Sequence, residues 1–253
     1  MISKAKIKLI QSLKYKKYRT KTGLFVAEGV KTIQELLNSN VKVVEIFGLA
    51  EIIQEIEILE EVEVVRTTVN ELKKISFLST STNILALFEI PDYDISNSFQ
   101  TNFLIALDGV QDPGNLGTII RLADWYGIKN IICSTACADV FNPKVIQSTM
   151  GSIARVNVYY TNLPAFLQKA KREENYHIYG SFMDGESIYA TTFNEKKILI
   201  MGNEGNGISD EVEHLVEKKI SIPANFEGME GPESLNVAIA SAIIVSEISR
   251  TAL

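Results

Sequence analysis

The chain has 253 residues, of which 46% are hydrophobic and 22% are charged, and its formal net charge is −6. This length suits one large domain or two of moderate size, and these proportions are typical of globular proteins. No apolar run approaches the roughly 20 residues that span a bilayer, and the basic N-terminus lacks the apolar core of a secretion signal. These features exclude a membrane protein and predict a soluble, cytoplasmic one.

The first 21 residues hold eight of the 25 basic residues and no acidic residue, whereas the rest of the chain has 17 basic and 31 acidic residues. Clustered Lys and Arg bind phosphates, and the interleaved Tyr15 and Tyr18 are suited to stack on bases. The segment therefore predicts either an RNA-binding arm or a solvated helix face followed by a basic loop. The candidate RNA-binding residues are Lys14, Lys16, Lys17, Arg19 and Lys21.

Residues 24–89 alternate short β-rich runs with amphipathic stretches, which predicts a small α/β unit. The expected strands are 25–28, 41–47, 62–65 and 84–90, and the expected helices are 30–37 and 50–58. Residues 91–102 are polar and open with proline, so they are expected to form a linker. We expect a first domain over residues 1–95 and a second over residues 101–253.

The second domain is expected to be α/β, with a mostly parallel sheet covered on both faces, because strand-like runs alternate with helix-length segments. The runs are residues 103–107, 130–134, 154–160, 176–181, 196–201 and 218–223. The last helix, expected near residues 235–252, is apolar on nearly all sides. This pattern predicts burial against the sheet, against a second subunit, or both, so a homodimer is a hypothesis.

The cysteines and histidines give no sign of a metal site. Cys133 and Cys137 are too few for a disulfide framework, and His177 and His214 lie apart from them in the sequence without zinc-ligand spacing. We expect two reduced thiols and no metal.

The first segment that can carry chemistry is residues 107–127, a strand followed by a Gly/Pro/Asp-rich loop and a helix. Ligand crevices of parallel sheets lie beyond the carboxyl ends of strands. Asn115 is suited to cap the helix, and Arg121 follows about a turn and a half later. The alternative is that Asn115 only caps and that Arg121 is a surface cation.

The second segment, residues 198–212, is again a strand, a glycine loop and a helix for which Ser209 is the expected cap. Its glycines have the order G-x-x-G-x-G rather than G-x-G-x-x-G, which argues against a nicotinamide enzyme. Glu204 would repel a phosphate, but its charge suits an arginine or a sulfonium-bearing cofactor. In the third segment, residues 221–250, Ser234 and Asn236 open a buried helix, and capping alone would also explain Ser234.

The three segments contain Asn-x-Gly-x-x-x-Arg at 115–121, Gly-Asn-Glu-Gly at 202–205, and Ile-Pro followed by Glu-Ser-Leu-Asn-Val at 233–237. In this order they closely resemble the SpoU, or TrmH-like, branch of the SPOUT RNA methyltransferases, from about Phe103 to the C-terminus. Residues 16–37 are similar to the small L30e-like domain that precedes many of these enzymes.

The resemblance implies an α/β domain whose C-terminal portion forms a deep trefoil knot, an exception to the unknotted topology of most proteins. It also implies S-adenosylmethionine as cofactor, held mainly by backbone groups, and a ribose 2′-hydroxyl in RNA as methyl acceptor. The cofactor-binding residues that it implies are Gly202, Asn203, Ile222, Pro223, Leu235 and Asn236.

Arg121 matches the arginine proposed as the catalytic base in this family. A guanidinium holds its proton tightly and is a poor base, so we expect Arg121 to hold the target phosphate and stabilise developing alkoxide charge. Glu204 is expected to orient Arg121. Asn115, Ser234 and Asn236 are expected to fix the ribose or the knot loops.

The chain departs from the family pattern at residues 224–232, a loop about four residues longer than expected that carries Glu227 and Glu230. We expect this loop to shape substrate choice. The N-terminal position of the basic segment favours ribosomal RNA as the substrate. The alternatives are a tRNA 2′-O-methyltransferase and a non-catalytic RNA-binding or ribosome-assembly protein.

Overall fold

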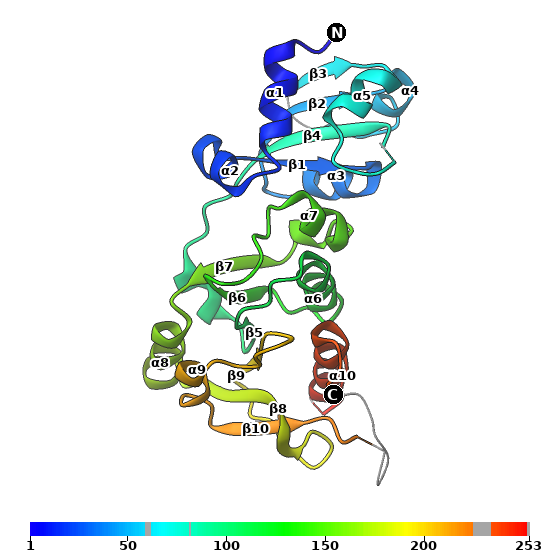
Figure 1. Ribbon diagram of the computed structural model, residues 1–253. Coiled ribbons are helices and arrows are strands. Elements are labelled where there is room, and N and C mark those ends of the chain that lie inside the picture. The colour runs from blue at the N-terminus through cyan, green and yellow to red at the C-terminus, as the bar shows by residue number, and fades with distance from the viewer. Residues whose placement is uncertain (59–61, 81, 225–233, 252–253) are drawn as a thin grey trace. The chain divides into compact units, whose positions relative to one another are not determined.

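The computed structural model describes residues 1–58, 62–80, 82–224 and 234–251 (Figure 1). The chain packs as two units, one of residues 1–92 with 139–155 and the other of residues 93–138 with 156–253. The sequence predicts one continuous range for each domain, and that division stays a prediction. The packing adds that residues 139–155, which lie inside the expected second range, belong with the first unit.

Unit 1 is a four-stranded sheet with helices, as the sequence predicts for residues 24–89. The strand order is β1-β4-β2-β3, in which β2 and β3 are parallel and the other neighbours are antiparallel. The strands are β1 (Leu24–Glu28), β2 (Val43–Gly48), β3 (Glu63–Arg66) and β4 (Ile84–Glu89). The helices are α1 (Lys4–Ser12), α2 (Lys16–Thr22), α3 (Val30–Leu37), α4 (Ala50–Ile53), α5 (Val69–Ile75), α7 (Pro143–Thr149) and the 3-10 helix η2 (Ser152–Ala154).

Helix α5 was not among the predicted elements, although the sequence contains its start signal. Thr68 and Glu71 form a capping box, in which the Thr68 hydroxyl accepts from the Glu71 amide and the Glu71 carboxylate accepts from the Thr68 amide at 2.9 Å. The helix buries Leu72 and Ile75 in the core of unit 1. The other buried members of this core are Ile10, Leu13, Val26, Phe47, Leu85 and Leu87.

Three contacts tie residues 139–155 to unit 1. Phe141 packs on Phe25, with ring centroids 4.9 Å apart. Arg155 forms an ion pair with Glu35, and Asp139 forms one with Arg19. The segment is therefore an integral part of this unit rather than a surface loop.

Unit 2 is built on a six-stranded sheet in which all neighbouring strands are parallel, so the predicted fold class is confirmed. Its order is β10-β8-β9-β5-β6-β7. The strands are β5 (Phe103–Leu107), β6 (Asn130–Ser134), β7 (Asn157–Thr161), β8 (His177–Ser187), β9 (Lys197–Met201) and β10 (Lys218–Ser221). The helices are α6 (Pro113–Trp125), α8 (Leu163–Glu173), α9 (Asp210–Glu213) and α10 (Val237–Arg250).

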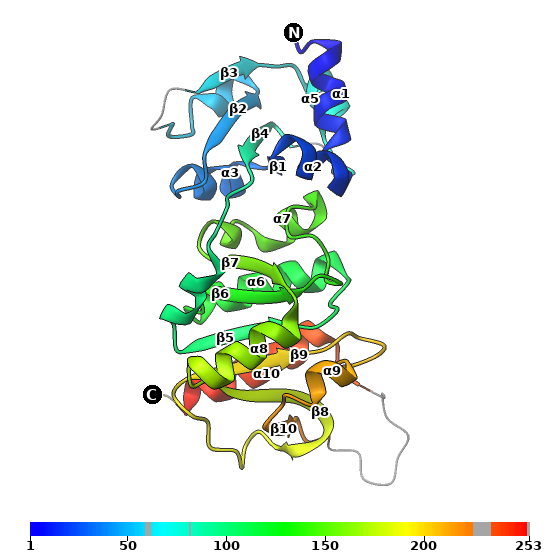
Figure 2. The same ribbon diagram turned by 90° about the vertical axis from the view of Figure 1, so that its left-hand side faces the viewer.

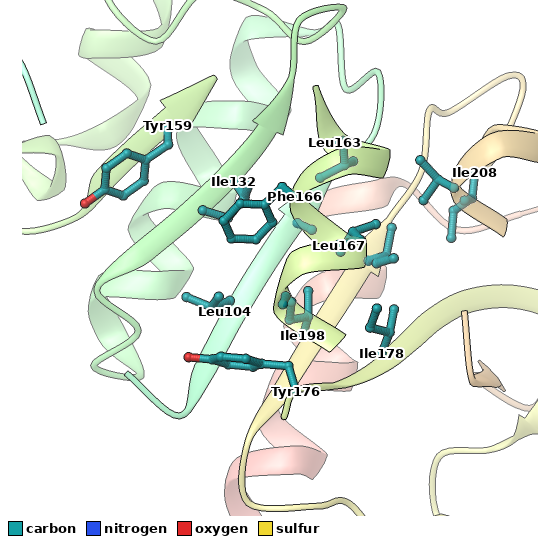
Figure 3. Close-up of a cluster of buried hydrophobic side chains, with 14 residues drawn as sticks. Leu104, Ile132, Tyr159, Leu163, Phe166, Leu167, Tyr176, Ile178, Ile198 and Ile208 are labelled. Atoms are coloured by element: carbon teal, nitrogen blue, oxygen red, sulfur yellow. The ribbon is translucent and has the colours of Figure 1, made fainter. Parts of the chain in front are cut away.

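Helices cover both faces of this sheet. Helices α6 and α10 lie together on one face, and α8 and α9 lie on the other (Figures 1 and 2). Figure 3 shows the core beneath α8, where Phe166 and Leu167 meet Leu104, Ile132 and Ile198 of the strands. These side chains come from four separate elements, so only the assembled sheet and helix bury them.

The expected linker, residues 91–102, contains a 3-10 helix, η1 (Ile95–Gln100), that packs on unit 2. Phe99 stacks on Phe166 of α8 with ring centroids 4.9 Å apart. The Asp94 carboxylate accepts from the Ser96 amide and starts this turn. The segment is therefore structured at its centre, because it contributes an aromatic ring to the core.

None of the helices within the described ranges is long and apolar enough to cross a membrane.

Candidate active site

The strand order of unit 2 explains why distant segments meet. Strand β5 lies between β9 and β6, and its last residue, Leu107, is paired with Met201 at the end of β9. The chain turns to opposite sides of the sheet from β5, and such switch points open a crevice at the carboxyl ends of the strands. The loop after Leu107 and the loop after Met201 therefore lie side by side.

The loop of residues 202–209, here called the glycine loop, is anchored to the end of β5 at two points. The Asn203 amide group donates to the carbonyl oxygen of Gly109 at 2.7 Å. The Asp108 carboxylate accepts from the amide of Ser209 at 2.9 Å and from its hydroxyl at 2.7 Å. Asp108 was not predicted as a site residue, although a carboxylate directly after a buried strand was a usable signal.

Two glycines of this loop are required by its own backbone. A Cβ added to Gly202 would lie 2.3 Å from the carbonyl carbon of Gly207, which no real side chain tolerates. Gly207 has a φ of +70°, in the left-handed region that favours glycine. The backbone amide of Asn203 donates to the Gly207 carbonyl at 2.8 Å, and the backbone amide of Gly207 donates to the Asn203 carbonyl at 2.9 Å. These two hydrogen bonds close the loop on itself.

Three predicted catalytic residues form one hydrogen-bonded chain, here called the three-loop chain. The Asn115 amide group donates to the Glu204 carboxylate at 2.6 Å, and the Asn236 amide group donates to the Asn115 side-chain oxygen at 2.9 Å. Asn115 is 89 residues from Glu204 and 121 residues from Asn236. The sequence grouped these residues, and the structure brings all three together.

The expected helix caps need correction. Asp112, not Asn115, caps α6, since its carboxylate accepts from the Asn115 amide at 2.8 Å. Asn236, not Ser234, caps α10, and its side-chain oxygen accepts from the two amides at the helix start. Ser209 holds the cap position of α9, but its side chain bonds to Asp108 instead. Because Asp112 serves as the cap, the Asn115 side chain remains available to join the loops.

A cavity of about 750 Å³ opens between these loops in unit 2, a volume within the range of small-molecule sites. Five of the six predicted cofactor residues line it, namely Gly202, Asn203, Ile222, Pro223 and Leu235. The sixth, Asn236, contacts the site through the three-loop chain. The predicted catalytic residues Ser234 and Glu204 also line the cavity. Residues 181–184 of β8 line it as well, and the sequence reasoning missed them.

The predicted pairing of Glu204 with Arg121 is absent from the described part of the chain. Arg121 is exposed on α6, and its guanidinium has no hydrogen bond or ion pair among the residues that the structure describes. Glu204 is bonded to Asn115 instead. Arg121 is therefore unengaged by those residues, while Glu204 serves to hold two loops together.

Both cysteines are free and buried near this site, as the sequence predicts. The Cys137 thiol donates to the Leu107 carbonyl at 3.2 Å. A hydrogen bond with Cys133 lowers the pKa of Cys137 to about 7 against the opposing effect of burial, whereas burial raises the pKa of Cys133. No group of three or more His, Cys, Asp or Glu side chains suited to a metal ion occurs within the described ranges.

The basic segment lies in unit 1, and the structure separates its residues into two groups. Lys14, Lys16, Lys17 and Lys21 are exposed. Arg19 is only 2% exposed, and its guanidinium donates to the Asp139 carboxylate and to the carbonyls of Leu13 and Lys14. With its guanidinium buried and paired within unit 1, Arg19 is indicated as a structural residue, which argues against its predicted role in RNA binding. The carboxylate that pairs with Arg19 is 120 residues away, so the sequence near Arg19 contains no signal of its burial.

The cavity and its loops fall within a known family. The SpoU rRNA Methylase family matches residues 102–246, and the MRM3-like substrate binding domain matches residues 4–86. A Bacillus subtilis protein named 23S rRNA (guanosine(2553)-2′-O)-methyltransferase RlmP is 31% identical over 241 residues, which is 95% of this chain and 94% of that protein.

Solved structures agree over nearly the whole chain. A TrmH-family protein from Porphyromonas gingivalis has a TM-score of 0.88 at 37% identity and covers 99% of both chains. An AdoMet-bound rRNA methyltransferase from Sinorhizobium meliloti has a TM-score of 0.86 at 26% identity and covers 100% of this chain and 98% of that chain. These likenesses support the predicted trefoil knot. Since the family match spans more than half of the sequence and includes the residues that line the cavity, the chain belongs to the SpoU rRNA methylase family.

Proposed function

We propose that this protein transfers the methyl group of S-adenosylmethionine to a ribose 2′-hydroxyl in the RNA of the large ribosomal subunit. The observation that carries the proposal is the three-loop chain Glu204–Asn115–Asn236 beside a cavity of suitable volume. The choice of large-subunit RNA is supported by the name of the Bacillus subtilis relative, which aligns with 95% of this chain.

The cavity fits the donor chemically. Gly202 leaves backbone exposed, and Ile222 and Leu235 offer apolar side chains that would cover an adenine ring. When bound, S-adenosylmethionine supplies a methyl carbon that its sulfonium group makes electrophilic. Because the reaction is an in-line displacement, the protein must hold the acceptor oxygen in line with that carbon.

Among the predicted site residues, Arg121 has the side chain best suited to bind the RNA. A guanidinium presents several hydrogen-bond donors in a planar fork and carries a positive charge, so it holds a phosphate and stabilises the oxygen as the hydroxyl loses its proton. Asn115 and Asn236 act as positioning residues through the three-loop chain. Ser234, on the cavity wall, is assigned to the ribose or to the loop that carries it.

The exposed lysines of unit 1, Lys14, Lys16, Lys17 and Lys21, are proposed to bind RNA phosphates. Two exposed tyrosines, Tyr15 and Tyr18, lie among them and offer ring faces for stacking. A ribosomal substrate also supports a cytoplasmic location, which fractionation of cells would test.

We also propose that the protein is a homodimer through α6 and α10. These helices pack together, yet Ile239 of α10 is 53% exposed, Leu235 just before α10 is 46% exposed, and Trp125 of α6 is 84% exposed. Exposed apolar side chains on neighbouring helices are typical of an interface. Light scattering of the purified protein should give twice the chain mass, and a monomer at micromolar concentration would refute this proposal.

The function is tested by incubating the protein with S-adenosylmethionine labelled in its methyl group and with ribosomal RNA or tRNA from cells lacking the gene. Label should enter the large-subunit RNA at a 2′-O-methyl that is missing from those cells. Label only in tRNA would instead support the alternative substrate, and no label in any RNA would support a non-catalytic RNA-binding protein.

Arg121→Ala should abolish methyl transfer while the affinity for S-adenosylhomocysteine in calorimetry stays within about threefold of wild type, since Arg121 does not line the cavity. Arg172→Ala is the matched control, because Arg172 is an exposed arginine of α8 on the other face of the sheet. Equal loss of activity and binding in Arg121→Ala would reject the role given to Arg121.

A further inference from the structure

The cavity is acidic. In the part of the chain that the structure describes, its charged lining residues are Asp184 and Glu204, and no Lys, Arg or His lines it. A site lined by charge of one sign and walled by apolar groups concentrates the potential of that charge. The cavity therefore favours a positively charged ligand.

The two carboxylates reach the cavity from neighbouring parallel strands. Gly180 of β8 is paired with Ile200 of β9, and each acidic residue follows its own strand's member of this pair by four positions. The parallel register thus delivers both acids to the same end of the sheet. Asp184 lies in β8, and this strand is outside the three sequence segments that resemble the family.

The ammonium of Lys219 leaves Asp184 only partly neutralised. Lys219 donates to the Glu213 carboxylate at 2.6 Å, and its ammonium lies 4.5 Å from the ring centroid of Phe182. Its pKa is raised by that hydrogen bond and further by the charges of Glu213 and Asp184. One lysine thus compensates two carboxylates, so the group of Lys219, Glu213 and Asp184 keeps a net negative charge. Among the residues that the structure describes, Glu204 has only the neutral Asn115 as its hydrogen-bond partner.

We propose that Asp184 is a specificity-determining residue that makes the cavity prefer the cationic donor, S-adenosylmethionine, over its demethylated product. This inference rests on the proposed function and adds a residue and a selection rule to it. The donor carries an ammonium, a sulfonium and a carboxylate, whereas S-adenosylhomocysteine lacks the sulfonium charge and is neutral overall. Because Coulomb attraction acts on that difference of one charge, the cavity holds the product less tightly than the donor and releases it.

Calorimetry with S-adenosylmethionine, S-adenosylhomocysteine and sinefungin, which carries an amine in place of the sulfonium, tests the proposal on the full chain. Asp184→Asn should weaken binding of the two cationic ligands by about 3- to 10-fold and change the affinity for S-adenosylhomocysteine by less than about twofold. Glu186→Gln is the matched control, because Glu186 lies two residues along β8, does not line the cavity and pairs with Lys218. It should leave all three affinities unchanged.

Glu213→Gln gives a second, independent test with Asp184 intact. The change frees Lys219 to neutralise Asp184, so the preference for the cationic ligands should fall in the same direction. The proposal is overturned if Asp184→Asn weakens all three ligands equally or weakens none. A wild-type protein that binds neither donor nor product would refute the proposed function, whereas normal binding with an unchanged preference would refute only the role of Asp184.

Discussion

Replacing Arg19 with methionine should destabilise unit 1 by about 3 kcal/mol and leave RNA binding intact. Removing one partner of a buried ion pair costs about 3–5 kcal/mol, because the remaining charge stays buried without compensation. Here Asp139 keeps 16% side-chain exposure and would be partly hydrated, which places the expected cost at the lower end. The same change also removes the donors to the carbonyls of Leu13 and Lys14.

Hydrogen exchange of the backbone amides in β1 and α2 measures the opening free energy of unit 1 directly. Arg19→Met should lower it by the stated amount, and the double variant with Asp139→Asn should cost less than the sum of the two single changes. RNA affinity, measured at a temperature where the variant stays folded, should remain within about twofold of wild type.

Lys17→Met is the matched control for this experiment. Lys17 is exposed two residues before Arg19, and its ammonium lies 4.9 Å from the Tyr18 ring centroid. It should change stability by less than about 0.5 kcal/mol, weaken RNA binding and reduce the salt dependence of binding by about one unit. If Arg19→Met unfolded like wild type and lost RNA affinity instead, the structural role of Arg19 would be wrong.

Three further predictions concern the site and unit 1. Asn115→Ala breaks both bonds of the partly exposed three-loop chain, so kcat/KM should fall about 5- to 30-fold, and an unchanged value would show that the chain does not position the loops. Gly202→Ala should abolish donor binding in calorimetry, whereas Gly205→Ala, whose added Cβ would meet nothing closer than 3.5 Å, should bind normally; equal behaviour would contradict the packing argument. Hydrogen bonds from Thr68 and then from Ile2 lower the pKa of Glu71 from 4.5, so its contribution to stability is present above that pH and is lost as pH falls through the lowered value. Glu71→Gln should therefore flatten the acid side of the stability profile of unit 1, and a profile identical to wild type would exclude this contribution.

The sequence alone determined most of the secondary structure and grouped the residues of the site. Apolar runs bounded by polar segments predicted all six strands of unit 2, and helix α3 begins and ends where its amphipathic period predicts. Five of the six implied cofactor residues line one cavity. The strands and helix α3 are local features, because each depends on the order of residues within a few positions, whereas the cofactor residues were grouped by the resemblance to a family.

Only the tertiary structure decided which side chains serve the scaffold and which serve the site. Arg19 looked like any other cation of the basic segment, but its partner Asp139 is 120 residues away. Glu204 was expected to hold Arg121, yet the pairing of β5 with β9 brings Asn115 to it instead. Asp184 entered the cavity through the register of β8 with β9. Such assignments depend on contacts between residues distant in the chain, and local propensity and spacing carry no information about them.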